Sequence, residues 1–154
     1  MTERLKRTVR TPVGLMLLVQ EGEGLTRLRW SDALVSDDSE LLDEAESQLE
    51  AYFAGTLAHF QLPLRYHCSD FQQSACEAMA QIPYGSTITY GEMARNLGSS
   101  AQAVGVACGG NPFPVIIPCH RVLAANGIGG YSGEGGIETK ISLLKMEGGF
   151  PWLL

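Results

Sequence analysis

The sequence is poor in positive charge, with 11 lysines and arginines against 17 aspartates and glutamates and a formal net charge of −6. Phosphate binding draws on Lys and Arg to displace counterions, so this balance weighs against a large polyanionic partner. The acids crowd into residues 37–50, however, whereas residues 76–154 are nearly balanced. The charge therefore argues against nucleic acid without excluding it.

Long apolar runs are also lacking. No stretch approaches the roughly 18 apolar residues of a membrane span, and the basic residues 1–10 lead into no apolar stretch of signal-peptide length. We therefore expect a cytoplasmic protein with no membrane partner. At 154 residues, 45% hydrophobic and 18% charged, the chain is long enough for one ordinary core or two small lobes.

The sequence also lacks the cysteine and histidine spacings that are typical of metal sites. The four cysteines come with no C-x-x-C or H-x-x-x-H pair, and in a reducing compartment their even number says little about disulfides. No metal and no cofactor is expected. The cysteines are Cys68, Cys76, Cys108 and Cys119.

Residues 1–67 predict a small α/β lobe. Two apolar, β-prone runs at 13–20 and 24–30 are joined across Glu21-Gly22-Glu23, which indicates a hairpin. After the acidic stretch, apolar residues recur at helical spacing between a capping Ser39 and a terminating Gly55. These apolar residues are Leu41, Leu42, Ala45, Leu49, Tyr52 and Phe53.

Residues 68–154 predict a mainly helical second lobe. One helix over 71–82 is expected to stop at Pro83-Tyr84-Gly85. Next, Thr89 can cap a helix that Gly98 closes, and Ser99 or Ser100 can cap a second one. This outline is that of a helix-turn-helix.

The second helix of that pair carries mostly small side chains. Its backbone could approach a nucleic-acid groove closely, and a helix buried tightly against its neighbours would show the same pattern. The pattern leaves both interpretations open. The small residues are Ala101, Ala103, Gly105 and Ala107.

Cys119 follows an apolar run that ends in Val115-Ile116-Ile117, where a strand is expected to run out. A buried core cysteine is the default interpretation of such a residue. Its neighbours favour a reactive thiol: Pro118 ends strand pairing, and His120 and Arg121 supply a base and a positive charge that favour thiolate. Because neighbours on a strand point to opposite faces, His120 reaches the sulfur only if the backbone turns or a water bridges them.

Several segments together resemble one known family, the O6-alkylguanine-DNA alkyltransferases, also called methylated-DNA–protein-cysteine methyltransferases. The C-terminal segments are "FQ" at 71–72, "IPYGSTITYGEMA" at 82–94, "AVG" at 103–105, "NPFPVIIPCHRV" at 111–122, "GYSG" at 130–133 and "KISLLKMEG" at 140–148. The N-terminal "TPVGLMLLV", "GLTRLRW", "QLEAYFAG" and "LPL" occur in the expected order. The resemblance covers nearly the whole chain. It implies a ribonuclease-H-like N-terminal lobe and a DNA-repair alkyltransferase that acts once per molecule on O6-alkylguanine and O4-alkylthymine.

The resemblance also implies a role for each catalytic residue. Cys119 resembles the acceptor thiolate, His120 the base that takes its proton through a water, and Glu147 the carboxylate that orients the imidazole. Asn111 resembles a hinge residue, and Tyr90 the hydroxyl that donates to guanine N3.

The implied partner is double-stranded DNA, bound by a monomer through the minor groove with the damaged base flipped out. Ser132 resembles the residue whose backbone N–H meets O6, and Val122 and Tyr131 belong to the implied base-binding set. The implied groove-binding residues are Ala101, Gln102, Ala103 and Gly105.

Two departures from the family pattern affect these implications. Gln102 stands where the family has an arginine that fills the gap left by the flipped base, and the turn between Gly98 and Gln102 is two residues shorter and lacks the usual proline. The loop between Tyr131 and Lys140 is about two residues longer.

Two alternatives therefore stay open. A non-enzymatic relative that binds alkylated DNA is one, although such relatives lose the reactive cysteine. A thiol enzyme or sensor for small electrophiles is the other, and the acidic charge and Gln102 favour it.

Overall fold

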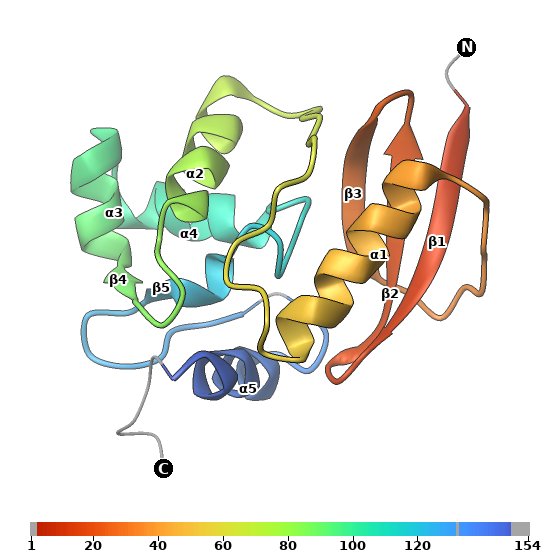
Figure 1. Cartoon of the computed structure of the whole chain (residues 1–154). Helices are drawn as coiled ribbons and strands as arrows, with labels where there is room; N and C mark the ends of the chain where they lie inside the picture. Colours follow the sequence, from red (N-terminus) through yellow and green to blue (C-terminus); the bar gives the residue numbers. More distant parts are fainter. Residues whose placement is uncertain (1–2, 132, 149–154) are drawn as a thin grey trace. The chain divides into compact units, whose positions relative to one another are not determined.

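The computed structural model describes residues 3–131 and 133–148. Contacts between Cα atoms divide the chain into two compact units between His67 and Cys68. Figure 1 traces the elements of both units in chain order. No helix of the described residues is long and apolar enough to cross a membrane.

The first unit is a three-stranded antiparallel sheet with one helix lying across it (Figure 1). The strands β1 (Arg4–Thr11), β2 (Gly14–Glu21) and β3 (Gly24–Trp30) pair in sequence order. The predicted hairpin of β2 and β3 is confirmed, with Gly22 at a φ of 61° in its turn. The basic start of the chain, for which no strand was predicted, forms β1, because alternate residues such as Arg7 and Val9 face inward.

Helix α1 (Glu40–Phe53) begins at the predicted cap. The Ser39 hydroxyl accepts a hydrogen bond from the Leu42 N–H at 3.2 Å, and Gly55 follows the helix end with a φ of 80°. Its apolar side packs onto β1 and β2 and is fully buried. The buried residues of this helix are Leu42, Ala45, Leu49 and Tyr52.

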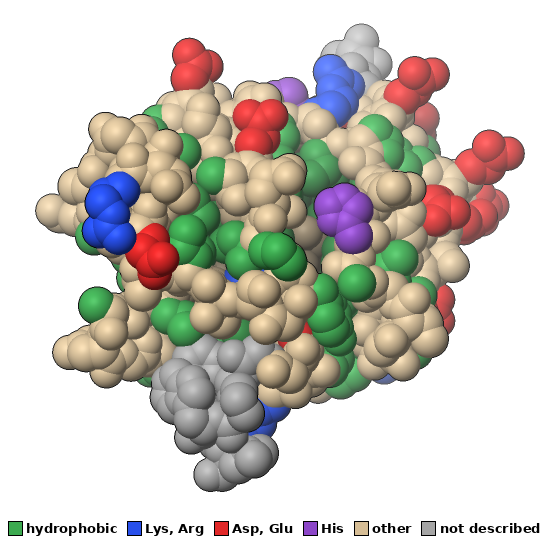
Figure 2. Space-filling view, turned by 60° about the vertical axis from the view of Figure 1, so that its left-hand side comes forward, with side chains coloured by type: hydrophobic (Ala, Val, Ile, Leu, Met, Phe, Trp, Pro, Cys, Tyr) green, Lys and Arg blue, Asp and Glu red, His purple; other side chains and the backbone are tan. Residues whose placement is uncertain are grey.

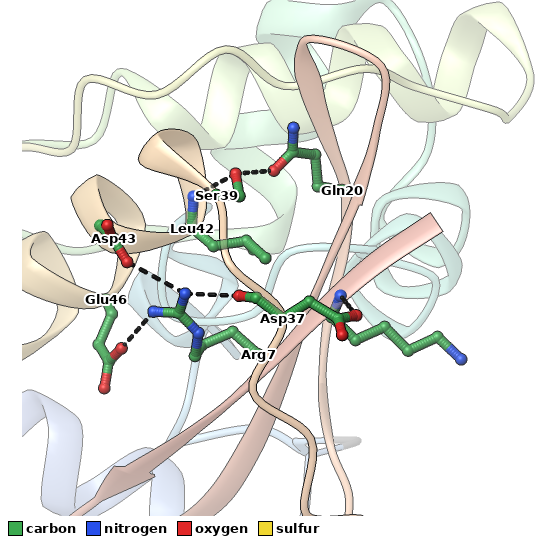
Figure 3. A network of polar contacts seen from close by, with 8 residues as sticks. Arg7, Gln20, Asp37, Ser39, Leu42, Asp43 and Glu46 are labelled. Atoms are coloured by element: carbon green, nitrogen blue, oxygen red, sulfur yellow. Dashed lines mark hydrogen bonds and ion pairs between the residues drawn. The ribbon is translucent and has the colours of Figure 1, made fainter. Parts of the chain in front are cut away.

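A polar network around Arg7 joins β1 to the start of α1 (Figure 3). The Arg7 guanidinium lies 2.8 Å from a Glu46 oxygen and 3.0 Å from an Asp43 oxygen, and it donates to the Asp37 carbonyl at 2.6 Å. The buried Arg7 cation thus donates to three acceptors, two carboxylates and one backbone carbonyl. Two acids of the stretch 37–50, Asp43 and Glu46, thus pair with a buried cation of the same unit.

Among its described residues, the second unit contains four α-helices and a short parallel strand pair. The helices are α2 (Asp70–Ala80), α3 (Tyr90–Leu97), α4 (Ala101–Gly109) and α5 (Ile137–Glu147). Strand β4 (Ile88–Thr89) pairs with β5 (Val122–Leu123) in parallel. Helix α3 therefore starts directly beside the segment that contains Cys119.

The predicted helix-turn-helix is confirmed in α3 and α4. Thr89 and Glu92 form a reciprocal capping box at the start of α3, and Gly98 ends that helix at a φ of 63°. Ser100 is the cap of α4, since its hydroxyl accepts from the Ala103 N–H at 3.1 Å.

Burial separates the two interpretations of α4. One face packs into the unit through Val104, Ala107 and Cys108. The opposite face is exposed, so the small residues on it do not serve tight packing against a neighbouring helix. That exposed face consists of Ala101, Gln102, Gly105, Val106 and Gly109.

The strand expected before Cys119 was a wrong prediction. Residues 113–117 form a compact turn, closed by the Ile117 N–H that donates to the Phe113 carbonyl at 2.7 Å. Val115, with a φ of 76°, occupies the left-handed region that β-branched residues rarely adopt, and its side chain is buried. A one-turn 3₁₀ helix, η1 (Cys119–Arg121), follows. The backbone thus turns at Cys119, the condition under which a neighbouring histidine can approach the sulfur.

Candidate active site

The turn that carries Cys119 is held by the Asn111 side chain, directly after the end of α4. The Asn111 amide donates to the Ile117 carbonyl at 2.8 Å, and its oxygen accepts from the Phe113 N–H at 2.9 Å. Phe113 is fully buried and anchors the same turn. Asn111 therefore ties the C-terminal end of α4 to the Cys119 turn, the position that the family resemblance implied for it.

Cys119 lies at the wall of a cavity of about 310 Å³ and is only 5% exposed. Burial raises the pKa of its thiol, while a hydrogen bond from Asn111 and the charge of Lys140 act in the opposite direction. The expectation that neighbouring positive charge favours a resting thiolate was therefore wrong, because desolvation outweighs it. The thiol of the resting protein is neutral, so the site needs a base to activate it.

That base is available in a fully buried pair. His120 Nε2 lies 2.8 Å from Glu147 Oε2, and both side chains are shielded from solvent. Burial lowers the pKa of His120, so the imidazole is neutral. Because Arg121 holds Glu147 as an acceptor, we assign the histidine hydrogen to Nε2, which leaves Nδ1 unprotonated. Nδ1 is buried and has no hydrogen-bond partner among the described residues.

Arg121 fixes the carboxylate rather than the thiol. Its Nε donates to Glu147 Oε1 at 2.8 Å and its second nitrogen to Oε2 at 2.9 Å, a two-pronged contact. The third donor reaches the Ile82 carbonyl at 2.7 Å, and the guanidinium lies 5.7 Å from the centre of the Tyr84 ring. A Cβ added at Gly85 would come within 3.2 Å of the Glu147 carbonyl. The Pro83-Tyr84-Gly85 stretch, predicted only as a helix stop, thus also braces this cluster.

The cavity is lined by residues from α3, α4, η1 and the loop after β5. They are Tyr90, Gly105, Cys108, Gly109, Cys119, Gly130 and Tyr131. Burial raises the pKa of Tyr90 to about 12, so its hydroxyl remains a hydrogen-bond donor at neutral pH. Desolvation also raises the pKa of Tyr131. A planar, largely apolar ligand with one acceptor toward Tyr90 suits these walls.

Lys140, for which no role was predicted, is fully buried beside the cavity. Its ammonium donates to the Val122 carbonyl at 2.7 Å and to the Gly130 carbonyl at 3.0 Å, and lies 5.6 Å from the centre of the Tyr90 ring. Burial lowers its pKa to about 8. Lys140 thus links β5 to the loop that forms one cavity wall.

Replacing Lys140 by methionine should slow chemistry at Cys119 at least tenfold. Methionine has a similar length but leaves the Val122 and Gly130 carbonyls without a donor, at about 1–3 kcal/mol for each buried group. The charged form dominates below pH 8, so the help that the Lys140 charge gives to the Cys119 thiolate should be lost in the wild type between pH 7 and pH 9. The rate of alkylation of Cys119 and the melting temperature measure the effect, with Ser142→Ala as the control on the same helix. A Lys140→Met protein with a wild-type rate and pH profile would contradict this role.

The remaining predicted residues lie in three different places. Ala101, Gln102 and Ala103 belong to the first turn of α4, outside the cavity lining. The Val122 side chain is buried in the core, and only its carbonyl takes part in the site, through Lys140. Ser132 lies outside the described residues.

Besides the Pro83-Tyr84-Gly85 stretch, sequence reasoning missed other contributors to the site. Arg121 was assigned to the thiol instead of Glu147, and Lys140 and Cys108 were given no role. The clearest signal for Lys140 is its seven-residue spacing from Glu147 on one helix, which places both on the same face. Cys108 gave no signal beyond its position on α4.

Chemically, the arrangement is a buried nucleophile followed directly by a base and its orienting carboxylate, beside a cavity with a phenol donor. Such a series activates a thiol for attack on an electrophilic carbon. Within the described ranges, no cluster of three or more His, Cys, Asp or Glu side chains is placed to hold a metal ion.

Comparisons with known proteins match both units. Residues 5–66 match the family model described as 6-O-methylguanine DNA methyltransferase, ribonuclease-like domain. Residues 70–149 match the model described as 6-O-methylguanine DNA methyltransferase, DNA binding domain. The two matches span most of the chain.

Individual relatives agree. The methylated-DNA–protein-cysteine methyltransferase of Methanosarcina acetivorans is 42% identical over 150 residues, covering 90% of this chain and 94% of that protein. The crystal structure of Mycobacterium tuberculosis O6-methylguanine methyltransferase has a TM-score of 0.85 at 40% identity, covering 95% of this chain and 93% of that one. The M. tuberculosis protein in complex with DNA has a TM-score of 0.83 at 43% identity, covering 93% and 92%.

Proposed function

The chain belongs to the 6-O-methylguanine DNA methyltransferase family, and on this premise we propose that it repairs DNA by moving the alkyl group of O6-alkylguanine, and of O4-alkylthymine, onto Cys119. The observation that carries the proposal is the cavity with Cys119 at its wall, followed in the chain by His120 in a buried pair with Glu147. Each molecule acts once, because the thioether product is stable.

The reaction begins with removal of the thiol proton. His120 Nδ1 takes this proton through a water, and Glu147 stabilises the resulting imidazolium while Arg121 holds the carboxylate in place. The Cys119 sulfur then attacks the alkyl carbon in line with the bond to O6. A carbon–sulfur bond forms, the carbon–O6 bond breaks, and its electron pair stays on the base.

Stabilisation of the departing base falls to the cavity walls. Tyr90 donates a hydrogen bond to guanine N3 as negative charge develops, which its protonated hydroxyl permits. The backbone N–H of Ser132 is assigned to O6 on the family resemblance alone. Asn111 holds the turn before Cys119 next to the end of α4 through its hydrogen bond to the Ile117 carbonyl.

The two alternatives fit less well. Non-enzymatic relatives lose the reactive cysteine, and here Cys119 is present. A sensor for small electrophiles requires an accessible, low-pKa thiolate. Cys119 is buried and burial raises its pKa, so its reactivity depends on a substrate that fills the cavity.

The partner is DNA, and we assign α4 to its minor groove because three small residues, Ala101, Gly105 and Gly109, lie on the exposed side of that helix and allow a close approach of its backbone. The damaged base is flipped into the cavity, since O6 cannot be reached within a stacked duplex. The protein acts as a monomer in the cytoplasm.

Mass spectrometry of the intact protein tests the proposal. After mixing with a duplex that contains O6-methylguanine, the protein should gain the mass of one methylene group, and peptide mapping should place the methyl on Cys119. Unmodified guanine duplex is the control. An unchanged protein mass with the damaged duplex would reject the proposal.

Gln102 affects how the duplex is opened. Arginine in this position offers a planar cation that stacks on bases and meets phosphate, whereas glutamine keeps only a short planar amide. Since stacking contacts to bases are worth ~1–3 kcal/mol each, Gln102→Arg should speed transfer from a fully paired duplex about tenfold. Single-stranded DNA already presents an open base, so the gain there should be smaller. Single-turnover rates measure both, and equal gains on the two substrates would refute this role.

A further inference from the structure

The exposed face of α4 contains one large apolar side chain, Val106, which is 70% exposed. It lies one helical turn after Gln102, so the two side chains are neighbours on the same face. Gly105 and Gly109, on either side of Val106, line the cavity. Val106 thus borders the mouth of the cavity that holds Cys119.

The packing of α4 determines which way Val106 faces. The Gln72 amide donates to the Ala107 carbonyl at 2.8 Å, and a Cβ at Gly110 would come within 3.0 Å of the Gln72 side-chain oxygen. Val104 and Ala107 are buried on the opposite side of the helix, so this packing places Val106 on the exposed face.

Charge around this face is sparse. Among the described residues from 68 onward, the exposed cations are Arg95 and Lys145, whereas Arg121 and Lys140 are buried and hydrogen-bonded within the site. Figure 2 shows the same scarcity on one side of the molecule, where the blue groups are isolated from one another. The exposed acids of this unit are Asp70, Glu77, Glu92, Glu134 and Glu138.

From these observations, and resting on the proposed function, we infer that Val106 is a DNA-binding residue and that this unit grips the minor groove mainly by uncharged contacts. A DNA-binding unit with so few exposed cations gains little from counterion release. Apolar contact with the deoxyribose walls is then an important source of affinity besides the contacts of the flipped base, and minor-groove proteins use apolar wedges at opened base steps. Val106 packs against the sugar edge beside the gap left by the flipped base, next to Gln102.

The first test separates binding from chemistry. In single-turnover kinetics, Val106→Thr, which keeps the shape but adds a hydroxyl, should raise the DNA concentration for half-maximal transfer about fivefold to tenfold. The saturating rate should stay within about twofold, because the cavity and the His120 pair are untouched. Ile137→Thr, at another exposed apolar residue of the same unit, should change neither value.

The second test measures salt dependence. With two exposed cations, the slope of log affinity against log salt should be no steeper than about −2, and Val106→Lys should steepen it by about one. A steeper wild-type slope would show that cations outside this unit contact phosphate and would overturn the inference. An unchanged half-saturation in Val106→Thr, or a change only in self-association by sedimentation, would also overturn it. Methyl transfer by the wild type in the same assay reports on the proposed function separately.

Discussion

Replacing Cys119 by serine should abolish alkyl transfer, with a loss of at least about a thousandfold, while the fold remains intact. A neutral hydroxyl is a far weaker nucleophile toward saturated carbon than a thiolate. At neutral pH, His120 is too weak a base to convert the serine hydroxyl of the variant into an alkoxide. The substitution keeps the size of a small side chain within a buried turn, so the stability cost should be modest. Methyl transfer and the melting temperature are measured on the same preparation.

Three other cysteines provide internal controls for this result. Cys68 is exposed, and Cys68→Ser should retain full transfer. Cys76 and Cys108 are buried, and burial raises their pKa values to about 11 and about 12, so neither supplies a thiolate at neutral pH. Methyl label on any of these three residues in the wild type, or on the substituted serine in the peptide map of the Cys119→Ser protein, would contradict the assignment of Cys119.

The features predicted correctly from the sequence depend on short-range chemistry. Ser39, Thr89 and Ser100 cap helices because their hydroxyls accept hydrogen bonds from backbone N–H groups three residues later. Gly98 ends α3 because its φ of 63° favours glycine. Such signals lie within one turn of chain, so no knowledge of the tertiary fold is needed to find them.

Long-range contacts explain the failures. Strand β1 forms through pairing with β2 and the Arg7 network, neither of which is visible in the basic residues 1–10. Residues 113–117 have strand-like composition, but the Asn111 amide and the left-handed Val115 fold them into a turn. The pKa of Cys119 was misjudged because burial of the thiol in the folded chain raises it, and because Arg121 pairs with Glu147.

The Cys-His-Glu series itself followed from the family resemblance, and the structure adds what holds it together. Glu147 lies 27 positions after His120 in the sequence, and nothing in that spacing indicates a contact. The two side chains meet because α5 packs against η1. Arg121 then explains why an ionised carboxylate is tolerated in a buried place, since a buried charge needs a hydrogen-bonded partner.

Replacing Glu147 by glutamine should slow alkyl transfer by a factor of about 10²–10⁴, the usual contribution of a positioned acid–base group. The amide can still accept from His120 Nε2, but it cannot stabilise the imidazolium that forms when the thiol proton is taken. Binding to alkylated DNA should change by no more than a few fold, because Glu147 is buried away from the exposed face of α4. Single-turnover rates at saturating DNA, together with half-saturation concentrations, separate the two effects.

The same substitution should also lower stability, by about 3–5 kcal/mol, because it leaves the Arg121 cation buried without its two-pronged partner. Glu147→Gln combined with Arg121→Met removes that unpaired charge and should recover part of the stability without recovering transfer. Glu138→Gln, at an exposed acid on the same helix, is the matched control and should alter neither property.

That double substitution distinguishes catalysis from folding. If transfer recovers together with the melting temperature, Glu147 acts only by holding α5 against η1, and the proton relay through His120 is wrong. If transfer stays low in a well-folded protein, the carboxylate charge is needed for the reaction itself. A thiol titration adds an independent measure: His120→Ala should shift the pH dependence of Cys119 alkylation, and coincident curves for variant and wild type would argue that the thiol is activated without this base.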